Sequence, residues 1–195
     1  MSGRDCSWRN DRNSPSERRS VASLRVSGAF IPATLATVRW TGMKILLLCW
    51  RDTTHPQGGG SERYLERVGA YLAEQGHEVV YRTASHTDAS RRSLRDGILF
   101  QRLGGKYSVY LLAPLAIWRQ RPDVIVDTQN GIPFFARLFT HRPVVLLTHH
   151  CHQEQWPVAG PVIGRLGWFL ESRLAPRVYR GAQYVTVSEA VSYTH

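Results

Sequence analysis

Short apolar runs that alternate with amphipathic segments constrain the fold of this chain more than any other feature. Residues 45–50 (ILLLCW) form a continuous apolar run bounded by charged residues, as is typical of a strand buried on both faces. Such alternation predicts a parallel sheet with right-handed crossovers. We therefore expect an α/β fold, a single Rossmann-like domain whose parallel sheet of about six or seven strands is flanked by helices. The further predicted strands are residues 77–82, 96–103, 123–127, 143–148 and 183–187, and the predicted helices are residues 61–75, 107–120 and 166–180.

The first predicted helix carries its own start and stop signals. Ser61 is expected to act as the N-cap, since serine can accept a hydrogen bond from a free amide of the first turn. Leu65, Val68 and Leu72 recur at a spacing that places them on one buried face. Gly76 stands where a glycine commonly ends a helix.

The first 42 residues differ in composition from the rest of the chain. They are polar and rich in Arg and Ser, without strand or helix periodicity, so we expect a disordered extension or an over-predicted start. An Arg-Arg pair at 18–19 leaves a twin-arginine export signal as an alternative, although no clear small-residue cleavage site follows. Met43 opens the first strand, so residues 43–190 are expected to form the folded domain and residues 191–195 a truncated tail.

Composition narrows the class of protein. The 195 residues suffice for one domain, and the net charge of +10 favours anionic partners such as phosphates, nucleic acid or membrane surfaces without naming one. Three widely spaced cysteines (Cys6, Cys49 and Cys151) form no disulfide framework, which fits a reducing compartment. No run of about 18 apolar residues occurs, so we predict no spanning helix and a cytoplasmic location.

A glycine-rich loop follows the first strand. Gly58, Gly59 and Gly60 lead directly into Ser61 and the predicted helix, so backbone amides and the positive end of a helix could approach a phosphate there. Neither the GxGxxG nor the GxxxxGK[ST] fingerprint is present, which disfavours a dinucleotide oxidoreductase and a nucleoside-triphosphate loop. The alternative is a flexible surface loop.

A histidine-rich segment leaves the fifth strand. His149, His150, Cys151 and His152 invite a zinc interpretation, but adjacent residues of an extended segment point to opposite faces, so we predict no metal site. A histidine at this strand end could instead orient a sugar hydroxyl, donate to a phosphate or carry a proton. Glu154, just beyond, could line the same crevice. The alternative is a histidine that is merely satisfied at a strand end.

The loop after the fourth strand is also polar. Asp127, Gln129 and Asn130 are suited to ligands rich in hydroxyl groups, and the alternative is a simple Asn-Gly turn. These three loops leave the carboxyl ends of strands, where doubly wound sheets bind their ligands. Their expected convergence is stronger evidence for a site than any single loop.

Five segments give the chain a family resemblance, and over about residues 43–190 it is similar to the N-terminal half of a family 4 glycosyltransferase. The most specific elements are the glycine loop that enters the first helix, the strand that ends in histidine, and the closing V-S-E. The segments are MKILLLCW (43–50), GGGSERYLERVGAYLAEQGHEVVYRT (58–83), RPDVIVDTQNGIPFF (121–135), RPVVLLTHHCHQEQW (142–156) and ESRLAPRVYRGAQYVTVSEA (171–190).

The resemblance implies a GT-B architecture, in which two Rossmann-like domains face each other across a cleft. It implies a retaining, metal-independent transfer, of hexosyl type, from a nucleotide-diphosphate sugar to a sugar or lipid-linked acceptor, with no other cofactor. By position, His150 aligns best with the family's active-site histidine, and His149 is the alternative one residue away. Glycines 58–60 would approach the donor phosphates or the acceptor, and Asp127 and Asn130 would touch the acceptor.

The sequence departs from the family where the donor domain is expected. The family's donor site includes two glutamates separated by seven residues in the C-terminal domain, and this sequence ends at VSEAVSYTH before that domain. We therefore expect the chain alone to be inactive, with a donor domain that is encoded separately or lost through truncation. The alternative function is a non-catalytic Rossmann-like remnant or scaffold.

The last predicted helix suggests a further partner. Arg165, Arg173, Arg177 and Arg180 make it basic, although Pro176 could break it. Such a helix could rest on an anionic membrane, which would place the protein at the inner face of the membrane. A solvated basic face explains the arginines equally well. We predict no nucleic-acid partner.

Overall fold

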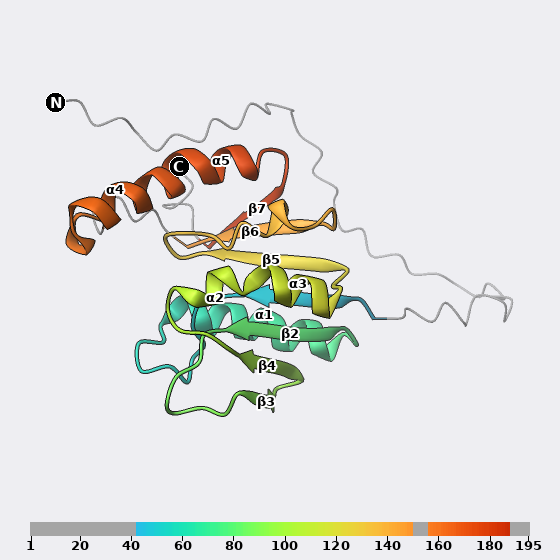
Figure 1. The fold of residues 1–195 in the computed structure, drawn as a ribbon. Coiled ribbons are helices and arrows are strands. Elements are labelled where there is room, and N and C mark those ends of the chain that lie inside the picture. Colours follow the sequence, from blue (N-terminus) through green and yellow to red (C-terminus); the bar gives the residue numbers. More distant parts are fainter. Residues whose placement is uncertain (1–41, 150–155, 188–195) are drawn as a thin grey trace, which may run out of the picture.

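The computed structural model of the protein describes residues 42–149 and 156–187, which form an α/β domain around one sheet (Figure 1). The seven described strands lie in the order β3-β4-β2-β1-β5-β6-β7, and every neighbouring pair is parallel except β3 with β4. This confirms the predicted Rossmann-like fold class. The strands are β1 (Lys44–Leu48), β2 (Glu78–Thr83), β3 (Arg92–Arg95), β4 (Ile98–Arg102), β5 (Val124–Gln129), β6 (Val144–Thr148) and β7 (Gln183–Thr186).

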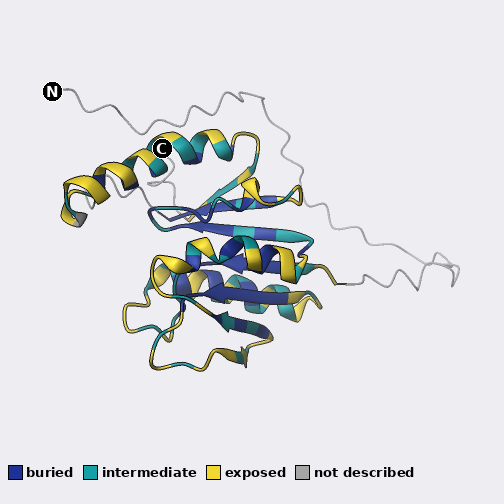
Figure 2. Cartoon of the chain, in the orientation of Figure 1, coloured by how far each residue is buried: buried dark blue, intermediate teal, exposed yellow. Residues whose placement is uncertain are grey.

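Helices cover the two faces of the sheet unevenly. Helix α1 (Gly60–Glu74) packs on β2 and β4, whereas α2 (Ser108–Leu111), α3 (Ala113–Gln120) and α5 (Ala175–Val178) lie on the opposite face. Burial is densest along the central strands (Figure 2). A Cβ on Gly69 would lie 2.9 Å from the side chains of Leu47 and Ile98, so the glycine permits the close approach of α1.

The central strands are apolar without alternation because both of their faces are covered. Leu46, Leu47 and Leu48 of β1 are fully buried, although successive side chains point to opposite faces. Leu46 and Leu48 join the core under α2 and α3, and Leu47 joins the core under α1. Because both faces are buried, the strand is a continuous apolar run, and this is why it could be predicted from the local sequence.

One edge of the sheet differs from the prediction. The third predicted strand, residues 96–103, is shorter in the structure (β4), and the antiparallel strand β3 precedes it. A two-residue turn joins them, in which Asp96 and Gly97 both have positive φ values (51° and 74°), the geometry of a tight hairpin. Strand β3 escaped prediction because an edge strand with an RSLR sequence carries little apolar signal.

The helices also depart from prediction at their ends. The predicted helix 107–120 is divided into α2 and α3, and Gly59 rather than Ser61 is the N-cap of α1. The predicted helix 166–180 starts earlier, with α4 (Pro161–Phe169), and continues through the π-helical turn η4 (Leu170–Leu174) into α5. Gly76 ends α1 with a φ of +86°, as predicted.

Two short helical turns complete the described elements, η2 (Ala136–Leu138) and η3 (Trp156–Ala159). Within the described ranges, no helix is long and apolar enough to cross a membrane. Most of the predicted extension at residues 1–42 and the predicted tail at residues 191–195 lie outside the described residues.

Candidate functional site

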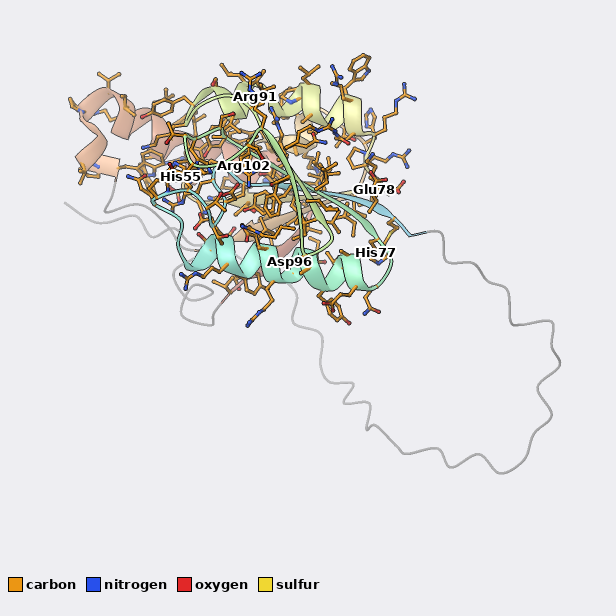
Figure 3. The ribbon with its side chains drawn as sticks, turned by 90° about the horizontal axis from the view of Figure 1, so that it is seen from below. His55, His77, Glu78, Arg91, Asp96 and Arg102 are labelled. Carbon is orange, nitrogen blue, oxygen red and sulfur yellow. The ribbon has the colours of Figure 1, made fainter. Side chains whose placement is uncertain are left out.

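Three loops meet at the edge of the sheet where the parallel strands β1, β5 and β6 end. They carry glycines 58–60, Asn130 and His149, respectively. Because these strands are neighbours and parallel, their carboxyl ends share one edge. Figure 3 shows His55, from the first of these loops, beside the end where α1 begins, whereas His77 lies at the other end of that helix. The structure thus brings the three predicted loops to one side of the molecule.

Glu62 organises the start of α1. Its side chain is fully buried, and its two carboxylate oxygens accept hydrogen bonds from the Gly59 amide (2.7 Å, to Oε2) and from Nε of Arg51 (2.8 Å, to Oε1). Burial alone would raise the pKa of this carboxyl, but these two bonds outweigh burial and hold the pKa below its usual value. Glu62 therefore remains charged and fixes the glycine loop onto the helix.

The three glycines of the loop differ in role. The Gly58 amide donates to the carbonyl of His55 (2.7 Å), and a Cβ on Gly58 would lie 2.9 Å from the Asp52 carbonyl oxygen. Gly59 donates to Glu62, as described above. Gly60 stands at the first helical position with open space around the site of a Cβ. Of the predicted phosphate cradle, the amides of Gly60 and Ser61 are therefore the best placed to face a ligand.

Asn130 links the loop after β5 to the start of α1. Its Nδ2 lies 3.3 Å from Oγ of Ser61 and 3.4 Å from Oε1 of Glu62. Its Oδ1 is buried and has no hydrogen-bond partner in the part of the chain that the structure describes. Two of the predicted site residues, Ser61 and Asn130, are thus in direct contact, with one acceptor atom of the amide available.

Asp127 has a structural role that differs from the predicted contact with an acceptor. It is fully buried, and its carboxylate accepts hydrogen bonds from the amides of Phe134 (2.8 Å) and Ala136 (2.9 Å) and from the hydroxyl of Tyr179. Burial raises the pKa of Asp127 more than these bonds lower it, and burial next to Asp127 raises the pKa of Tyr179. Both carboxylate oxygens accept hydrogen bonds, so Asp127 holds the backbone of residues 134–136 in place.

The histidine segment is described only at its first residue. His149 is buried, and its ring meets that of Tyr64 on α1 edge to face, with centroids 6.0 Å apart. It therefore lies on the same side of the sheet as α1. His150 and Glu154, the other predicted residues of this segment, lie outside the described residues.

A buried ion pair that the sequence did not reveal supports the first loop. Oδ2 of Asp52 lies 2.6 Å from Nε of Arg102, and the amide and hydroxyl of Thr54 donate to Oδ1. Burial would raise the pKa of Asp52, but the Thr54 and Arg102 contacts outweigh it and hold the pKa below the ordinary value. Fifty residues separate the partners, and no local pattern connects them.

Aromatic and cationic side chains gather beside this pair. The ring of Trp50 is met edge-on by His55 at 5.5 Å, and the guanidinium of Arg51 lies 4.5 Å from its centroid. His86 contacts His55 at 5.3 Å, and its Nε2 lies 3.1 Å from the Thr54 hydroxyl. Burial, together with the nearby side chains of His86 and Arg51, lowers the pKa of His55 below its ordinary value, which favours the neutral ring near pH 7.

The described residues contain no group of three or more His, Cys, Asp or Glu side chains that could hold a metal ion. The polar groups described above at this edge are amides, hydroxyls, imidazoles and paired charges. Such groups bind hydroxyl-rich and phosphate-bearing ligands through hydrogen bonds.

Comparison with known families identifies a match. The model of a family described as Glycosyltransferase Family 4 matches residues 58–193, which is more than two thirds of the chain. The match begins at the first glycine of the loop and spans β5, β6 and β7. No curated protein matches the chain significantly.

Proposed function

The chain belongs to glycosyltransferase family 4, and from that premise we propose that it is the acceptor-binding half of a transferase. The reaction would move a sugar, of hexosyl type, from a nucleotide-diphosphate donor to a sugar or lipid-linked acceptor. We propose that it retains the anomeric configuration and needs no metal ion or other cofactor. The nucleotide half of the donor would be held by a second domain, on this polypeptide or on another.

One observation carries this proposal: three loops are joined at the carboxyl edge of the sheet. Glu62 connects the first loop to α1, and Asn130 connects the second loop to Ser61 and Glu62. The third loop approaches through the contact between His149 and Tyr64. A ligand at this edge would thus meet an open helix start, an amide oxygen and an imidazole within one area.

We propose roles from this arrangement and, for His150 and Glu154, from the family to which the chain belongs. The amides of Gly60 and Ser61, at the positive end of α1, would donate to phosphate oxygens of the donor when the second domain closes. Asn130, through its Oδ1, would accept a hydrogen bond from an acceptor hydroxyl. His150 would contact the transferred sugar, with His149 as the alternative, and Glu154 would contact the acceptor. An imidazole can donate a hydrogen bond from one ring nitrogen and accept one at the other when it is neutral, and it can carry a proton near neutral pH.

We further propose contact with an anionic membrane through α4. Val162, Leu166 and Phe169 are exposed on this helix, and Arg165 and Arg173 are exposed beside them. Figure 1 shows α4 extending away from the sheet. Apolar side chains flanked by arginines suit the boundary between acyl chains and anionic headgroups, and this would place the protein at the inner face of a cytoplasmic membrane. Co-sedimentation with phosphatidylglycerol vesicles, but not with phosphatidylcholine vesicles, is the expected result.

The test of the proposed function compares the chain with and without a donor domain. Residues 1–195 alone should transfer no sugar and bind common nucleotide-diphosphate sugars only weakly in titration calorimetry, because in this proposal the second domain supplies the base and ribose contacts. Combined with a family 4 donor domain, it should transfer labelled sugar, and His150→Ala should reduce turnover. Micromolar binding by the chain alone would contradict the half-site proposal. Absence of transfer in every combination would favour a non-catalytic binding protein.

A further inference from the structure

An open groove of about 1090 Å³ runs along the outer side of α1. One wall is the exposed face of the helix, and the other is the turn between β3 and β4. Figure 3 shows Asp96, at the tip of that turn, against the middle of α1. The residues that characterise the groove are Arg63, Tyr64, Arg67, Tyr71, Arg95 and Asp96.

Two exposed tyrosine rings on one face of α1 line the groove. Tyr64 and Tyr71 are 42% and 60% exposed, although tyrosine is usually more buried. Seven residues separate them, so they lie on the same face of α1, about 10.5 Å apart along the axis, which is roughly the length of two hexose units. Exposed aromatic rings at such a spacing offer stacking platforms for the apolar faces of pyranose rings.

The charges of the groove are balanced. Its lining includes three arginines and three carboxylates, and Nη2 of Arg95 pairs with Oε2 of Glu66 at 2.5 Å. Arg95 also donates to the hydroxyl of Thr53 (3.0 Å) and lies over the ring of Phe100, so the wall is fixed. A groove without net charge has no general attraction for phosphates or acidic polymers. Its guanidinium and carboxylate groups instead suit the paired hydroxyls of a sugar.

The groove is connected with the candidate site. Tyr64, at the end of the groove nearest the start of α1, contacts His149 of the loop after β6. An elongated ligand that leaves the site at this point would pass Tyr64 first and Tyr71 next along the same helix. The groove therefore suits an acceptor whose reacting end lies in the candidate site and whose remainder extends along α1.

We propose that this groove binds an uncharged oligosaccharide, the part of the acceptor that has already been built. The proposal rests on the proposed function, since it gives the acceptor class of that same site. Tyr64 and Tyr71 stack on alternate sugar units, and the side chains of Arg63 and Arg67 donate to hydroxyl groups. The acceptor would then be an extended glycan rather than a single sugar.

The test is direct binding, which needs no donor domain. Linear uncharged hexose oligosaccharides of two, four and six units, in α- and β-linked series, are titrated into the full chain. At least one series should bind more tightly as its length increases from two to six units. Tyr71→Ala should weaken that binding roughly tenfold or more, whereas Tyr71→Phe, which keeps the ring, should retain it. Tyr107→Ala is the matched control, since Tyr107 is 69% exposed and lies outside the groove.

Three results would overturn the proposal. The first is that no oligosaccharide of the panel binds, and the second is that binding is equally sensitive to Tyr71→Ala and Tyr107→Ala. The third is that sulfated oligosaccharides bind more tightly than uncharged ones of equal length. If one of these results is obtained while the chain still transfers sugar to a short acceptor with a donor domain, the groove proposal alone fails and the proposed function stands.

Discussion

The buried pair between Asp52 and Arg102 gives the most quantitative prediction. Their side chains are 0% and 2% exposed, with Oδ2 and Nε 2.6 Å apart. Asp52→Asn keeps the shape of the side chain but leaves the Arg102 charge buried without its counter-ion, which typically costs about 3–5 kcal/mol. For a domain of this size, a loss of about 3 kcal/mol corresponds to a decrease in Tm of roughly 6–12 °C.

The assay is urea denaturation of the full chain at neutral pH, with two comparison variants. Glu78→Gln breaks a pair with Lys44 that has a similar length (2.8 Å) but is exposed (58% and 28%), and it should cost about 0–1 kcal/mol. Adding Arg102→Met to Asp52→Asn removes the orphaned charge and should recover part of the loss. If Asp52→Asn costs no more than Glu78→Gln, the argument from burial is refuted.

Acid provides an independent check on the same pair. The pKa of Asp52 lies below 3.8 in the folded protein, so the folded state binds its proton less readily than the unfolded state does. The charged form therefore stabilises the fold above the unfolded pKa, and this contribution is lost as the pH falls through the folded pKa. The free-energy difference between the wild type and Asp52→Asn should be constant above about pH 5 and narrow below that pH.

Three other predictions concern packing, the chain start and the histidines. Gly167→Ala should destabilise the protein by about 1–3 kcal/mol in urea denaturation, because a Cβ there would lie 2.2 Å from the ring of Trp156. A chain that begins at Met43 should melt at the same temperature as the full chain, and a large decrease would mean that the extension packs on the domain. In a reconstituted two-domain enzyme, His150→Ala should reduce turnover about 10²–10⁴-fold with a stability cost of roughly 1 kcal/mol or less. His149→Ala should mainly lower the melting temperature, because its ring packs on α1; the reverse pattern would move the catalytic role to His149.

The sequence alone determined the fold class and the location of the candidate site. Strands such as β1 and β6 are apolar because both faces are buried, and this condition is visible in a few consecutive residues. The end of α1 at Gly76 could also be predicted from a local signal, since only that residue has to adopt a positive φ. Once the strands are parallel, their loops must meet at one edge, so the convergence of glycines 58–60, Asn130 and His149 also followed from the sequence.

Only the tertiary structure decided what the polar residues at that edge do. Asp127 and Asn130 look equally suited to a ligand in the sequence, but Asp127 is occupied by two amides and a tyrosine hydroxyl from distant positions, whereas an oxygen of Asn130 has no partner among the described residues. The pairing of Asp52 with Arg102 across 50 residues is likewise invisible to any local pattern. Local periodicity records how much of a residue is buried, whereas the partner of a buried charge depends on which strands become neighbours.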